Sequence, residues 1–298
     1  MPKEINKIVL GDTSIIDLMQ VNATPSDVIK GRTFHKADGS IGTGTAVLGA
    51  TVSGSRISVP GKTFVPSSWA DGTDEEIAAM VRAHYDGKIK LSDYWSVGDE
   101  RVVSLSAMEA TGVEESHAAQ NVVFVLSNVG GKYLADGVTE CAFQVDQKNT
   151  LNETGYMNST MTNIGGWKDS ARRTWCNSVY KNAIPSTLRG IFKEFINQSG
   201  TGGSSSSGVE DTTDTFALRA EIEIFGSRSY SVSGEGSQVT YYQTSSNRIK
   251  QANGSNSAWW GRSPKSGNSY RFCYVNTSGR PDYDGAYDGI KFAPFGVI

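Results

Sequence analysis

Residues 257–264 read SAWWGRSP, and residues 268–289 continue as NSYRFCYVNTSGRPDYDGAYDG. Adjacent residues in a strand point to opposite faces, so we expect one ring of the Trp259–Trp260 pair to anchor a core. Four tyrosines follow, interspersed with arginines, aspartates, glycines and serines. The stretch therefore predicts a rigid strand that leads into an unusually aromatic and charged segment.

The composition of this segment is typical of a binding surface. Tyrosine offers a large contact area with few rotatable bonds, while Ser, Gly and Asp offer adaptable polar contacts. Tyr and Arg are also enriched among the residues that dominate binding energy at interfaces. We therefore expect a ligand-binding surface made of Tyr270, Arg271, Tyr274, Asn276, Ser278, Arg280, Asp282, Tyr283, Asp284, Tyr287 and Asp288. Two other interpretations remain open: the rings could lie flat over the core, or they could be buried against a neighbouring subunit.

Helical patterns occur in three places before this segment. Thr73 and Glu76 form a capping box, and an apolar stripe follows at 77–85. A second helix is expected over 169–177, capped by Asp169, with its packed face formed by Ala171, Thr174 and Trp175. A third is expected over 185–198, because Pro185 suits a first helical position and apolar residues recur at helical spacing.

Strand patterns are more numerous and shorter. They are expected at 101–108, 121–129, 141–145, 215–226, 239–243, 271–276 and 290–298. Within 215–226 every second residue is apolar, which predicts a half-buried strand with Arg219, Glu221 and Glu223 on its wet side. A few helices followed by many short strands predict an α+β fold.

The chain is expected to have three parts. Residues 1–48 form a small module with a short helix at 25–30 and a hairpin around Asp38–Gly39. Residues 49–74 are a Gly/Ser/Pro-rich connector, and residues 75–298 form the large domain. The serine- and glycine-rich stretch within 199–211 is expected to be a flexible insertion in that domain.

Composition excludes several classes of protein. The net charge of -3 over 298 residues argues against a general nucleic-acid binder, and no apolar run reaches the roughly 20 residues that span a bilayer. The opening residues lack a signal-peptide pattern, which predicts synthesis in a cytoplasm. The three cysteines (Cys141, Cys176, Cys273) show no CxxC pair, so buried free thiols are expected.

Catalytic and metal-binding motifs are not evident. No GxSxG elbow, P-loop, Rossmann glycine pattern or HExxH is present, so no catalytic residue, metal site or cofactor is assigned. The carboxylate pairs Glu114–Glu115 and Glu221/Glu223 are best explained as solvated faces, and His117 alone supports no catalytic role. The run DYDGAYD at 282–288 leaves a structural cation open, although it lacks EF-hand spacing.

Several motifs, taken in order, resemble a known group of proteins. They are residues 157–195 (MNSTMTNIGGWKDSARRTWCNSVYKNAIPSTLRGIFKEF), RIK, WWGRSP, SGNSYRFCYVNTSG and the closing FAPFGVI. Together they resemble a domain of phage and prophage proteins of gut bacteria, similar to the C-type-lectin-like fold of variable proteins diversified by retroelements. The stretch NATPSDVIKGRTFHKADGSIGTGTA resembles short modules of tail proteins from phages that infect Gram-positive bacteria.

The resemblance implies a C-type-lectin-like, formylglycine-generating-enzyme-like domain behind a small amino-terminal module. It also implies a phage tail receptor-binding protein, or adhesin, located in the virion. Its expected partners are a bacterial cell-surface protein or glycan and other tail proteins, and its expected assembly is a homotrimer. In the retroelement families, Asn codons altered at their adenines yield Tyr, Asp, Ser, Arg or Gly. All the expected binding residues belong to the set reached in this way, whereas Trp259 and Lys265 do not.

Two alternatives follow from the same fold group. The formylglycine-generating oxidases use a pair of reactive cysteines with a metal, but only Cys273 lies in the candidate region. Fold alone does not carry that activity across, although an oxidase remains an alternative. A purely structural tail component, with its tyrosines buried between subunits, is the other.

Overall fold

The computed structural model describes residues 7–10, 13–17, 33–35, 41–43, 67–205 and 208–298. Two compact units are present, Met1–Val65 and Pro66–Ile298, and the boundaries expected at 48 and 74 stay predictions. In the first unit, β1 (Lys7–Leu10) pairs with β2 (Thr13–Asp17) and β3 (Thr33–His35) with β4 (Ile41–Thr43), both antiparallel. The β3–β4 pair agrees with the expected hairpin, while the expected helix at 25–30 lies outside the described residues.

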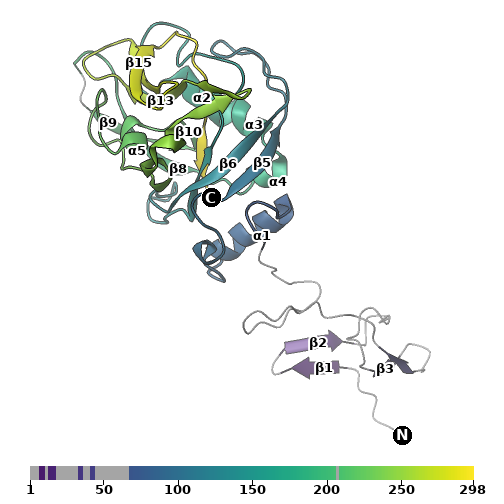
Figure 1. Ribbon diagram of the computed structural model, residues 1–298. Helices are drawn as coiled ribbons and strands as arrows, with labels where there is room; N and C mark the ends of the chain where they lie inside the picture. Colours follow the sequence, from purple (N-terminus) through teal and green to yellow (C-terminus); the bar gives the residue numbers. More distant parts are fainter. Residues whose placement is uncertain (1–6, 11–12, 18–32, 36–40, 44–66, 206–207) are drawn as a thin grey trace. The chain divides into compact units, whose positions relative to one another are not determined.

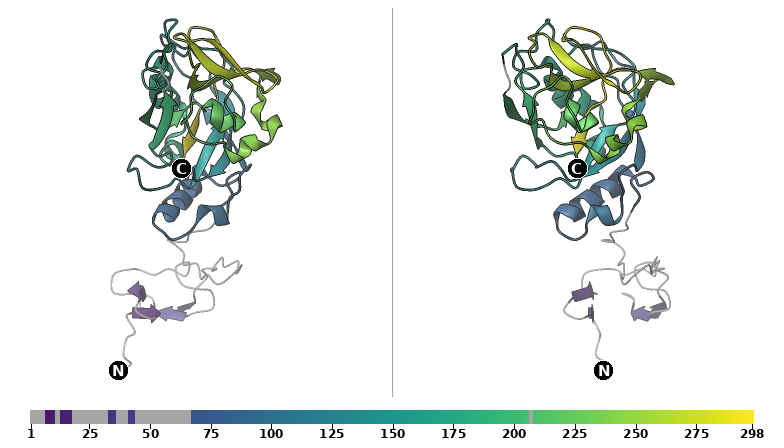
Figure 2. Two further views of the ribbon diagram at one scale, coloured as in Figure 1. Left: turned by 90° about the vertical axis from the view of Figure 1, so that its left-hand side faces the viewer. Right: turned by 60° about the vertical axis from the view of Figure 1, so that its left-hand side comes forward.

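The second unit begins with the predicted capping box. Helix α1 (Asp74–Tyr85) has Thr73 as its N-cap, and the Thr73 and Glu76 side chains bond each other's backbone N–H groups. Ile77, Met80 and Val81 are buried, as the stripe predicts. The predicted helix start and apolar stripe are thus confirmed. A capping box involves only residues that are close in sequence, so it can be recognised without the tertiary structure. In Figure 1, α1 lies at one end of the unit and β13 and β15 lie at the other, and both views in Figure 2 agree.

The main sheet has five antiparallel strands in the order β10–β16–β7–β6–β5. Their bounds are β5 Glu100–Leu105, β6 Gln120–Val129, β7 Phe143–Gln147, β10 Phe216–Ala217 and β16 Phe295–Val297. Every residue of β7 and β16 is buried, which makes them the centre of the core. The last strand thus closes the sheet between segments that are far apart in the sequence.

The connection between β7 and β8 is helical only in short pieces. The pieces are α2 (Ala171–Trp175), the π-helical segment η3 (Cys176–Tyr180), α3 (Lys181–Ala183) and α4 (Ser186–Arg189). The cap of α2 is Ser170 and not the predicted Asp169, since the Ser170 hydroxyl accepts the Arg173 backbone N–H. Its buried face carries Arg172 and Trp175, so the expected position of Thr174 on the packed face is wrong.

The predicted helix over 185–198 is also wrong beyond Arg189. The Lys193 N–H donates to Val297 of β16, and Phe195 begins strand β8 (Phe195–Gly200). The Phe195 ring packs on Phe295 with centroids 5.3 Å apart. Tertiary pairing therefore overrides an apolar spacing that suits a helix equally well.

The expected flexible insertion is shorter than 199–211. Strand β8 runs to Gly200 and pairs with β9 (Val209–Asp214), so the stretch is a β-hairpin whose tip includes residues 201–205. Ser199 and Gly200 are buried, and the Gly200 N–H donates to the Glu235 carboxylate. Composition predicts the turn correctly but not the strands on either side of it.

The region 215–226 departs most from its prediction. Only β10 is a strand, and helix α5 (Glu221–Phe225) follows it. Arg219, Glu221 and Glu223 are buried and not on a wet side. Arg219 donates to Asp146 of β7, and Glu223 accepts from Arg262, so these charges form an internal ionic network.

A second buried ionic cluster replaces the solvated Glu114–Glu115 pair that the sequence predicts. Glu114 is buried and forms an ion pair with Arg172, whereas Glu115 is exposed. The His117 imidazole lies between Glu114 and Glu153, with nitrogen–oxygen distances of 2.7 and 2.5 Å. Glu114 and the Glu221/Glu223 pair are therefore buried in the protein interior and do not form solvated faces.

The remaining elements are short, and the last three of them carry the aromatic segment. They are η2 (Leu91–Asp93), η4 (Thr240–Gln243), η5 (Ser245–Arg248), β11 (Lys250–Ala252), β12 (Ser255–Ser257), β13 (Trp259–Pro264), β14 (Arg271–Val275) and β15 (Pro281–Gly285). The strand expected at 239–243 is a 3-10 turn, and of 290–298 only Phe295–Val297 is a strand. The described residues as a whole form an α+β fold with mostly antiparallel strands.

Candidate binding surface on the carboxyl-terminal hairpin

A three-stranded antiparallel sheet, β13–β14–β15, supports the candidate surface. Both Trp259 and Trp260 are fully buried, so the expectation that only one of them anchors the core is too narrow. The Trp259 indole N–H donates to the Arg248 carbonyl, and that of Trp260 donates to the Gly155 carbonyl. The two faces of β13 are therefore both covered, which gives the hairpin a rigid base.

Arg262 fastens this base to the interior. Its guanidinium is buried and donates to Glu223 at 2.5 Å and to the carbonyls of Leu218, Gln198 and Glu235. A guanidinium satisfied on all sides holds its strand in one position, since a buried donor left unpaired is costly. The hairpin β14–β15 thus extends from a fixed strand.

Aromatic rings and cations surround Tyr283 on this surface. The Tyr230 ring meets the Tyr283 ring edge-on at 4.8 Å between centroids, and the Lys265 ammonium lies 4.8 Å from the Tyr283 centroid. The Arg271 guanidinium lies 5.0 Å from the rings of both Tyr270 and Tyr283. Such contacts are worth about 0.5–1 kcal/mol each at exposed sites, so they order the rings without burying them. We name this set, Tyr230, Lys265, Tyr270, Arg271 and Tyr283, the aromatic–cation cluster.

Tyr274 belongs to a different group. It lies opposite Asp282 in the β14–β15 ladder, and its ring meets the buried Trp260 edge-on at 5.9 Å. Burial, followed by the negative charge and hydrogen bond of Asp282, raises the pKa of Tyr274 to about 12. The tyrosine is therefore a neutral hydrogen-bond donor, half-buried beside an acid.

Asp284, Asp288 and Tyr287 lie together at the end of β15. Burial and a hydrogen bond to Asp288 raise the pKa of Asp284. Both carboxylates accept the Gly285 N–H, which fixes them close to one another. Tyr287 stacks on Tyr156 with centroids 4.4 Å apart and stays 47% exposed.

The turn between β14 and β15 holds the last three predicted residues. The Asn276 side chain accepts the N–H groups of Ser278 and Arg280, and this closes the turn. Ser278 and Arg280 are exposed, and Asn276 is half-buried. Asn276 therefore shapes the turn, while the other two face solvent.

The structure brings the predicted residues together on one hairpin, but in separate groups and not as one flat platform. Asp282 links two of these groups, since its charge acts on Tyr274 and also helps to raise the pKa of Tyr230 after burial. All eleven predicted residues are exposed or half-buried. Their role in binding stays a prediction.

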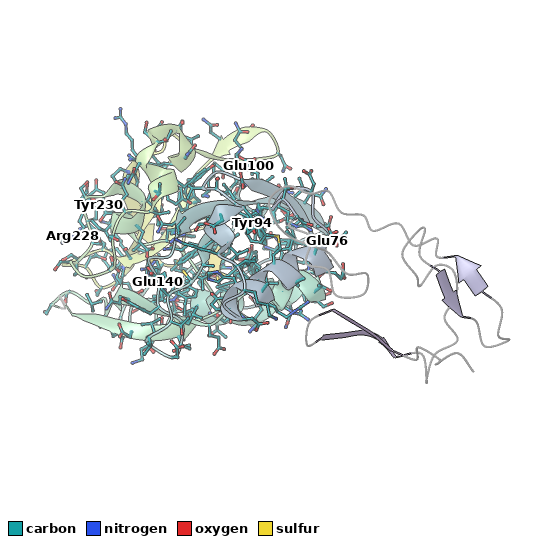
Figure 3. All side chains as sticks on the ribbon, turned by 90° about the horizontal axis from the view of Figure 1, so that it is seen from below. Glu76, Tyr94, Glu100, Glu140, Arg228 and Tyr230 are labelled. Carbon is teal, nitrogen blue, oxygen red and sulfur yellow. The ribbon has the colours of Figure 1, made fainter. Side chains whose placement is uncertain are left out.

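Sequence reasoning missed Tyr230, Lys265 and Tyr156. Tyr230 precedes the hairpin by about 40 residues, and no local pattern announces that it contacts Tyr283. Figure 3 shows Arg228 and Tyr230 together at the end of the unit opposite Glu76 of α1. A lysine directly after WWGRSP is a signal that could have suggested a role for Lys265 beside the aromatic segment.

Cys273 lies on β14, within the hairpin that carries the candidate surface. Cys273 is buried, and burial raises its pKa well above the usual range for a thiol. A thiol that resists ionisation is a poor nucleophile. Within residues 67–205 and 208–298 and the short amino-terminal strands, no group of three or more His, Cys, Asp or Glu side chains could hold a metal ion.

Comparison with known proteins adds a family. A profile described as a domain of unknown function, DUF6273, matches residues 120–292, which is more than half of the chain. The chain belongs to the DUF6273 family. The DUF6273 region contains β6 to β15, including the buried ionic network and the whole candidate surface. No curated protein and no solved structure matches the chain. Among the described residues, no helix of this DUF6273 protein is long and apolar enough to cross a membrane.

Proposed function

We propose that this protein is a binding protein that presents its carboxyl-terminal hairpin to a foreign surface ligand. The observation that carries the proposal is the aromatic–cation cluster. Three tyrosines and two cations lie half-exposed on or beside a sheet whose first strand, β13, is fully buried. Ordered rings at a surface lose little entropy when they bind, so the arrangement suits recognition.

The chemistry of the hairpin suits a polar partner. The exposed Tyr270 and Tyr287 offer ring surface for stacking on a peptide or a sugar, and Arg271 and Lys265 offer charge beside Tyr283. Asp282, Asp284 and Asp288 supply acceptors on the same hairpin. A ligand with both acidic and basic or hydroxyl groups, such as a bacterial surface protein or glycan, fits this set.

We further propose a C-type-lectin-like scaffold and a place in a phage tail. The antiparallel α+β core with a late, strand-rich aromatic segment is compatible with that scaffold, and the motif resemblance extends over the same region. Residues 1–65, a separate compact unit, would then attach the protein to other tail proteins. A homotrimer on a particle would multiply weak single sites, because effective concentration raises avidity by about 10²–10⁴.

An oxidase on a formylglycine-generating scaffold is the second candidate, and it is the weaker one. Such chemistry requires a reactive thiolate, whereas Cys141, Cys176 and Cys273 are all buried free thiols with raised pKa values. The cause in each case is first of all burial. The exposed tyrosines and charged groups of the hairpin, in contrast, are not required for a reaction of that kind.

The test is binding of the fluorescently labelled full-length protein to a panel of intact gut bacteria, measured by flow cytometry. Tyr283→Ala combined with Tyr230→Ala should reduce binding at least tenfold, since each removed anchor is worth about 1 kcal/mol or more. Tyr94→Ala is the matched control. It removes an exposed tyrosine that directly follows η2, outside the hairpin, and should bind as the parent does.

The double variant should keep the parent's circular dichroism spectrum and a cooperative urea transition, with a midpoint lowered only by the lost ring contacts, which are worth about 0.5–1 kcal/mol each. Unchanged cell binding by a folded double variant would show that the hairpin is not the binding surface. A bound strain would also provide the receptor, by fractionation of its envelope.

A further inference from the structure

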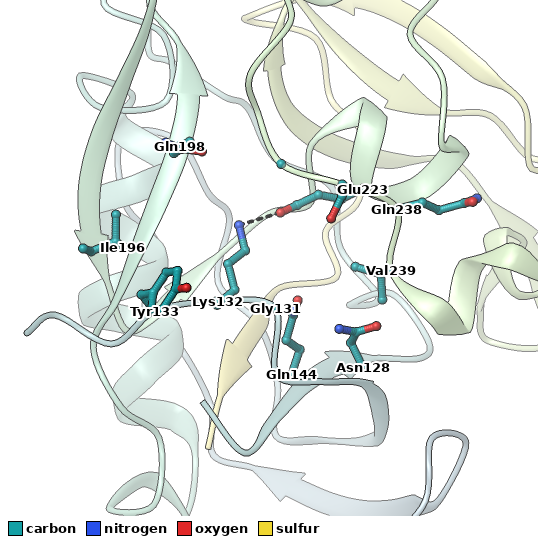
Figure 4. A pocket seen from close by; sticks show the side chains of 12 residues that line it. Asn128, Gly131, Lys132, Tyr133, Gln144, Ile196, Gln198, Glu223, Gln238 and Val239 are labelled. Atoms are coloured by element: carbon teal, nitrogen blue, oxygen red, sulfur yellow. Dashed lines mark ion pairs between the residues drawn. The ribbon is translucent and has the colours of Figure 1, made fainter. Parts of the chain in front are cut away.

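A polar cavity of about 290 Å³ lies apart from the hairpin, between β8, the end of β6 and the segment that follows α5. Figure 4 shows Lys132 extending across it toward Glu223. Ile196 and Gln198 stand on one side, and Gln238 and Val239 on the other. The residues lining it are mostly amides, hydroxyls and charged groups, so the cavity suits a polar molecule.

Lys132 forms the floor of this cavity. Its ammonium group is buried and donates to a Glu223 oxygen at 2.6 Å and to the Asn197 amide oxygen at 3.2 Å. An ammonium group has three N–H donors, so one of them has no hydrogen-bond acceptor among the described residues, although the Phe295 ring lies 5.9 Å from the ammonium. A buried donor without an acceptor is costly, and a ligand oxygen in the cavity would satisfy it.

The charges around Lys132 do not balance. Arg219 is matched by Asp146, at 2.5 Å, and Glu223 is shared between Lys132 and Arg262. Two cations therefore share one carboxylate. Burial lowers the pKa of Lys132 to about 8 despite the opposing charge of Glu223, and the cations Arg262 and Arg219 lower it further.

Neighbouring groups do not remove this positive excess. The carboxylate of Glu235, the next carboxyl group beside Arg262, accepts the Gly200 N–H and the Ser263 hydroxyl and makes no ion pair with Lys132; burial raises its pKa. Lys250 adds a further cation near Asp146. The floor of the cavity therefore favours an anion.

The rim of the cavity has free hydrogen-bonding groups of a different kind. Within the described part of the chain, no hydrogen bond occupies the side chains of Tyr133, Gln198 or Ser237, and all three are exposed. Gly236 keeps the entrance open: its φ is +119°, and a Cβ there would lie 3.2 Å from the Glu223 carboxylate. An aromatic hydroxyl, an amide and an aliphatic hydroxyl around a small opening can bond several ligand hydroxyl groups at once.

We propose that this cavity binds a small carboxylate that also carries hydroxyl groups, an acidic monosaccharide in chemical class. Its carboxylate accepts the third N–H of Lys132 and supplies the missing negative charge beside Lys132 and Arg262. Its hydroxyl groups bond Tyr133, Gln198 and Ser237 at the rim. This site is independent of the hairpin surface and uses none of its residues.

The test uses the full-length protein with D-glucuronate, D-glucose and acetate as separate probes, by titration calorimetry and ligand-observed NMR. D-Glucuronate should bind at least tenfold more tightly than D-glucose, because only it supplies a charge-assisted bond to the ammonium. It should also bind at least tenfold more tightly than acetate, which has no hydroxyl groups for the rim. Absence of D-glucuronate binding overturns the proposal, and equal binding of either of the other probes does so too.

Variants at the rim locate the site without touching the ionic network. Tyr133→Phe and Gln198→Ala should each weaken D-glucuronate binding about threefold to tenfold, the worth of one neutral hydrogen bond. Gln251→Ala, at an exposed glutamine of β11 that does not line the cavity, is the matched control and should bind as the parent does. If both rim variants bind as tightly as this control, the ligand is elsewhere and the proposal is wrong.

Lys132→Met tests the floor and should reduce binding at least tenfold. Because this variant could fail to fold, a second readout uses the unaltered protein. D-Glucuronate should slow the reductive methylation of Lys132, measured by peptide mass spectrometry, and should leave the rate at exposed Lys88 unchanged. Equal methylation of Lys132 with and without D-glucuronate would contradict its contact with the ligand.

Discussion

Asp284 and Asp288 are two titratable carboxyl groups that lie next to each other at the surface of the hairpin. Two carboxyl groups that are held together by the Gly285 N–H cannot both ionise at no cost. Burial, then the hydrogen bond to Asp288, raises the pKa of Asp284 above its ordinary value of 3.8. The proton is thus bound more tightly in the folded protein than in the unfolded chain.

This shift gives a pH prediction. The contribution of Asp284 to stability is full at low pH and is lost as pH rises from about 4 through the raised pKa. Asp284→Asn should therefore match the parent near pH 3 and gain in free energy of unfolding, relative to the parent, toward pH 7. Urea unfolding at both pH values checks this.

Asp86→Asn is the control with the opposite sign. A hydrogen bond from Lys88, the largest cause, lowers the pKa of Asp86, so this variant should lose a little stability as pH rises. The effect is small because the side chain is exposed. A parallel pH trend in the two variants would contradict the assignment of Asp284.

The burial of charged residues is the property of the interior that the sequence predicts least well. Alternation at 215–226 correctly marks buried Leu218, Ala220 and Ile224, but it places Arg219 and Glu223 in water. Their partners, Asp146 and Arg262, lie 73 and 39 positions away in the chain. Pairing of charges over such separations leaves no local pattern, so a periodicity argument cannot detect it.

At the scale of elements, local signals were reliable and apolar spacing alone was not. The capping box of α1 and the strands β5, β6, β7 and β14 were predictable, because caps and continuous apolar runs act locally. The helix expected over 185–198 fails because Phe192 and Phe195 pack on the rings of Phe216 and Phe295. The aromatic segment and strand β14 were predictable, but strand β15, which makes this segment a hairpin, was not, nor were the partners Tyr230 and Tyr156.

The turn that joins β14 and β15 carries a prediction at this scale. Gly279 has a φ of +75°, and a Cβ there would lie 2.8 Å from a side-chain carbon of Ile249. Gly279→Ala should lower the free energy of unfolding by about 2–4 kcal/mol, since backbone strain and steric overlap add. Chemical denaturation of the purified variant measures this.

Gly267→Ala separates the two causes. Gly267 has a similar φ of +68°, but a Cβ there would meet nothing within 4 Å. This variant should lose only the backbone part, about 1–2 kcal/mol. If both substitutions lower the free energy of unfolding by the same amount, steric overlap with Ile249 adds nothing to the backbone strain at Gly279.

At the scale of the whole molecule, the second unit is built to fold as one body. Strand β16 pairs with both β10 and β7, and the Phe143 and Ile298 backbones bond each other. These pairings join segments about 80 and 150 residues apart, and such non-local contacts predict slow, cooperative folding.

Residues 66–298 alone should therefore fold, with a urea midpoint and slope equal to those of the same unit in the full chain. The reason is that this unit has its own core. Removal of residues 295–298 from it should leave no cooperative transition, because the centre of the sheet is lost. A cooperative transition in the shortened protein would show that β16 is dispensable.

The buried arginines have a consequence for how this protein can change over generations. Arg172, Arg219 and Arg262 and their acidic partners hold the scaffold, and every one of them lies outside residues 270–288. Replacement of exposed side chains of that hairpin, such as Ser278 and Arg280, therefore leaves these buried ion pairs in place. Under the function proposed above, a binding surface of this kind could change in sequence without loss of the fold that carries it.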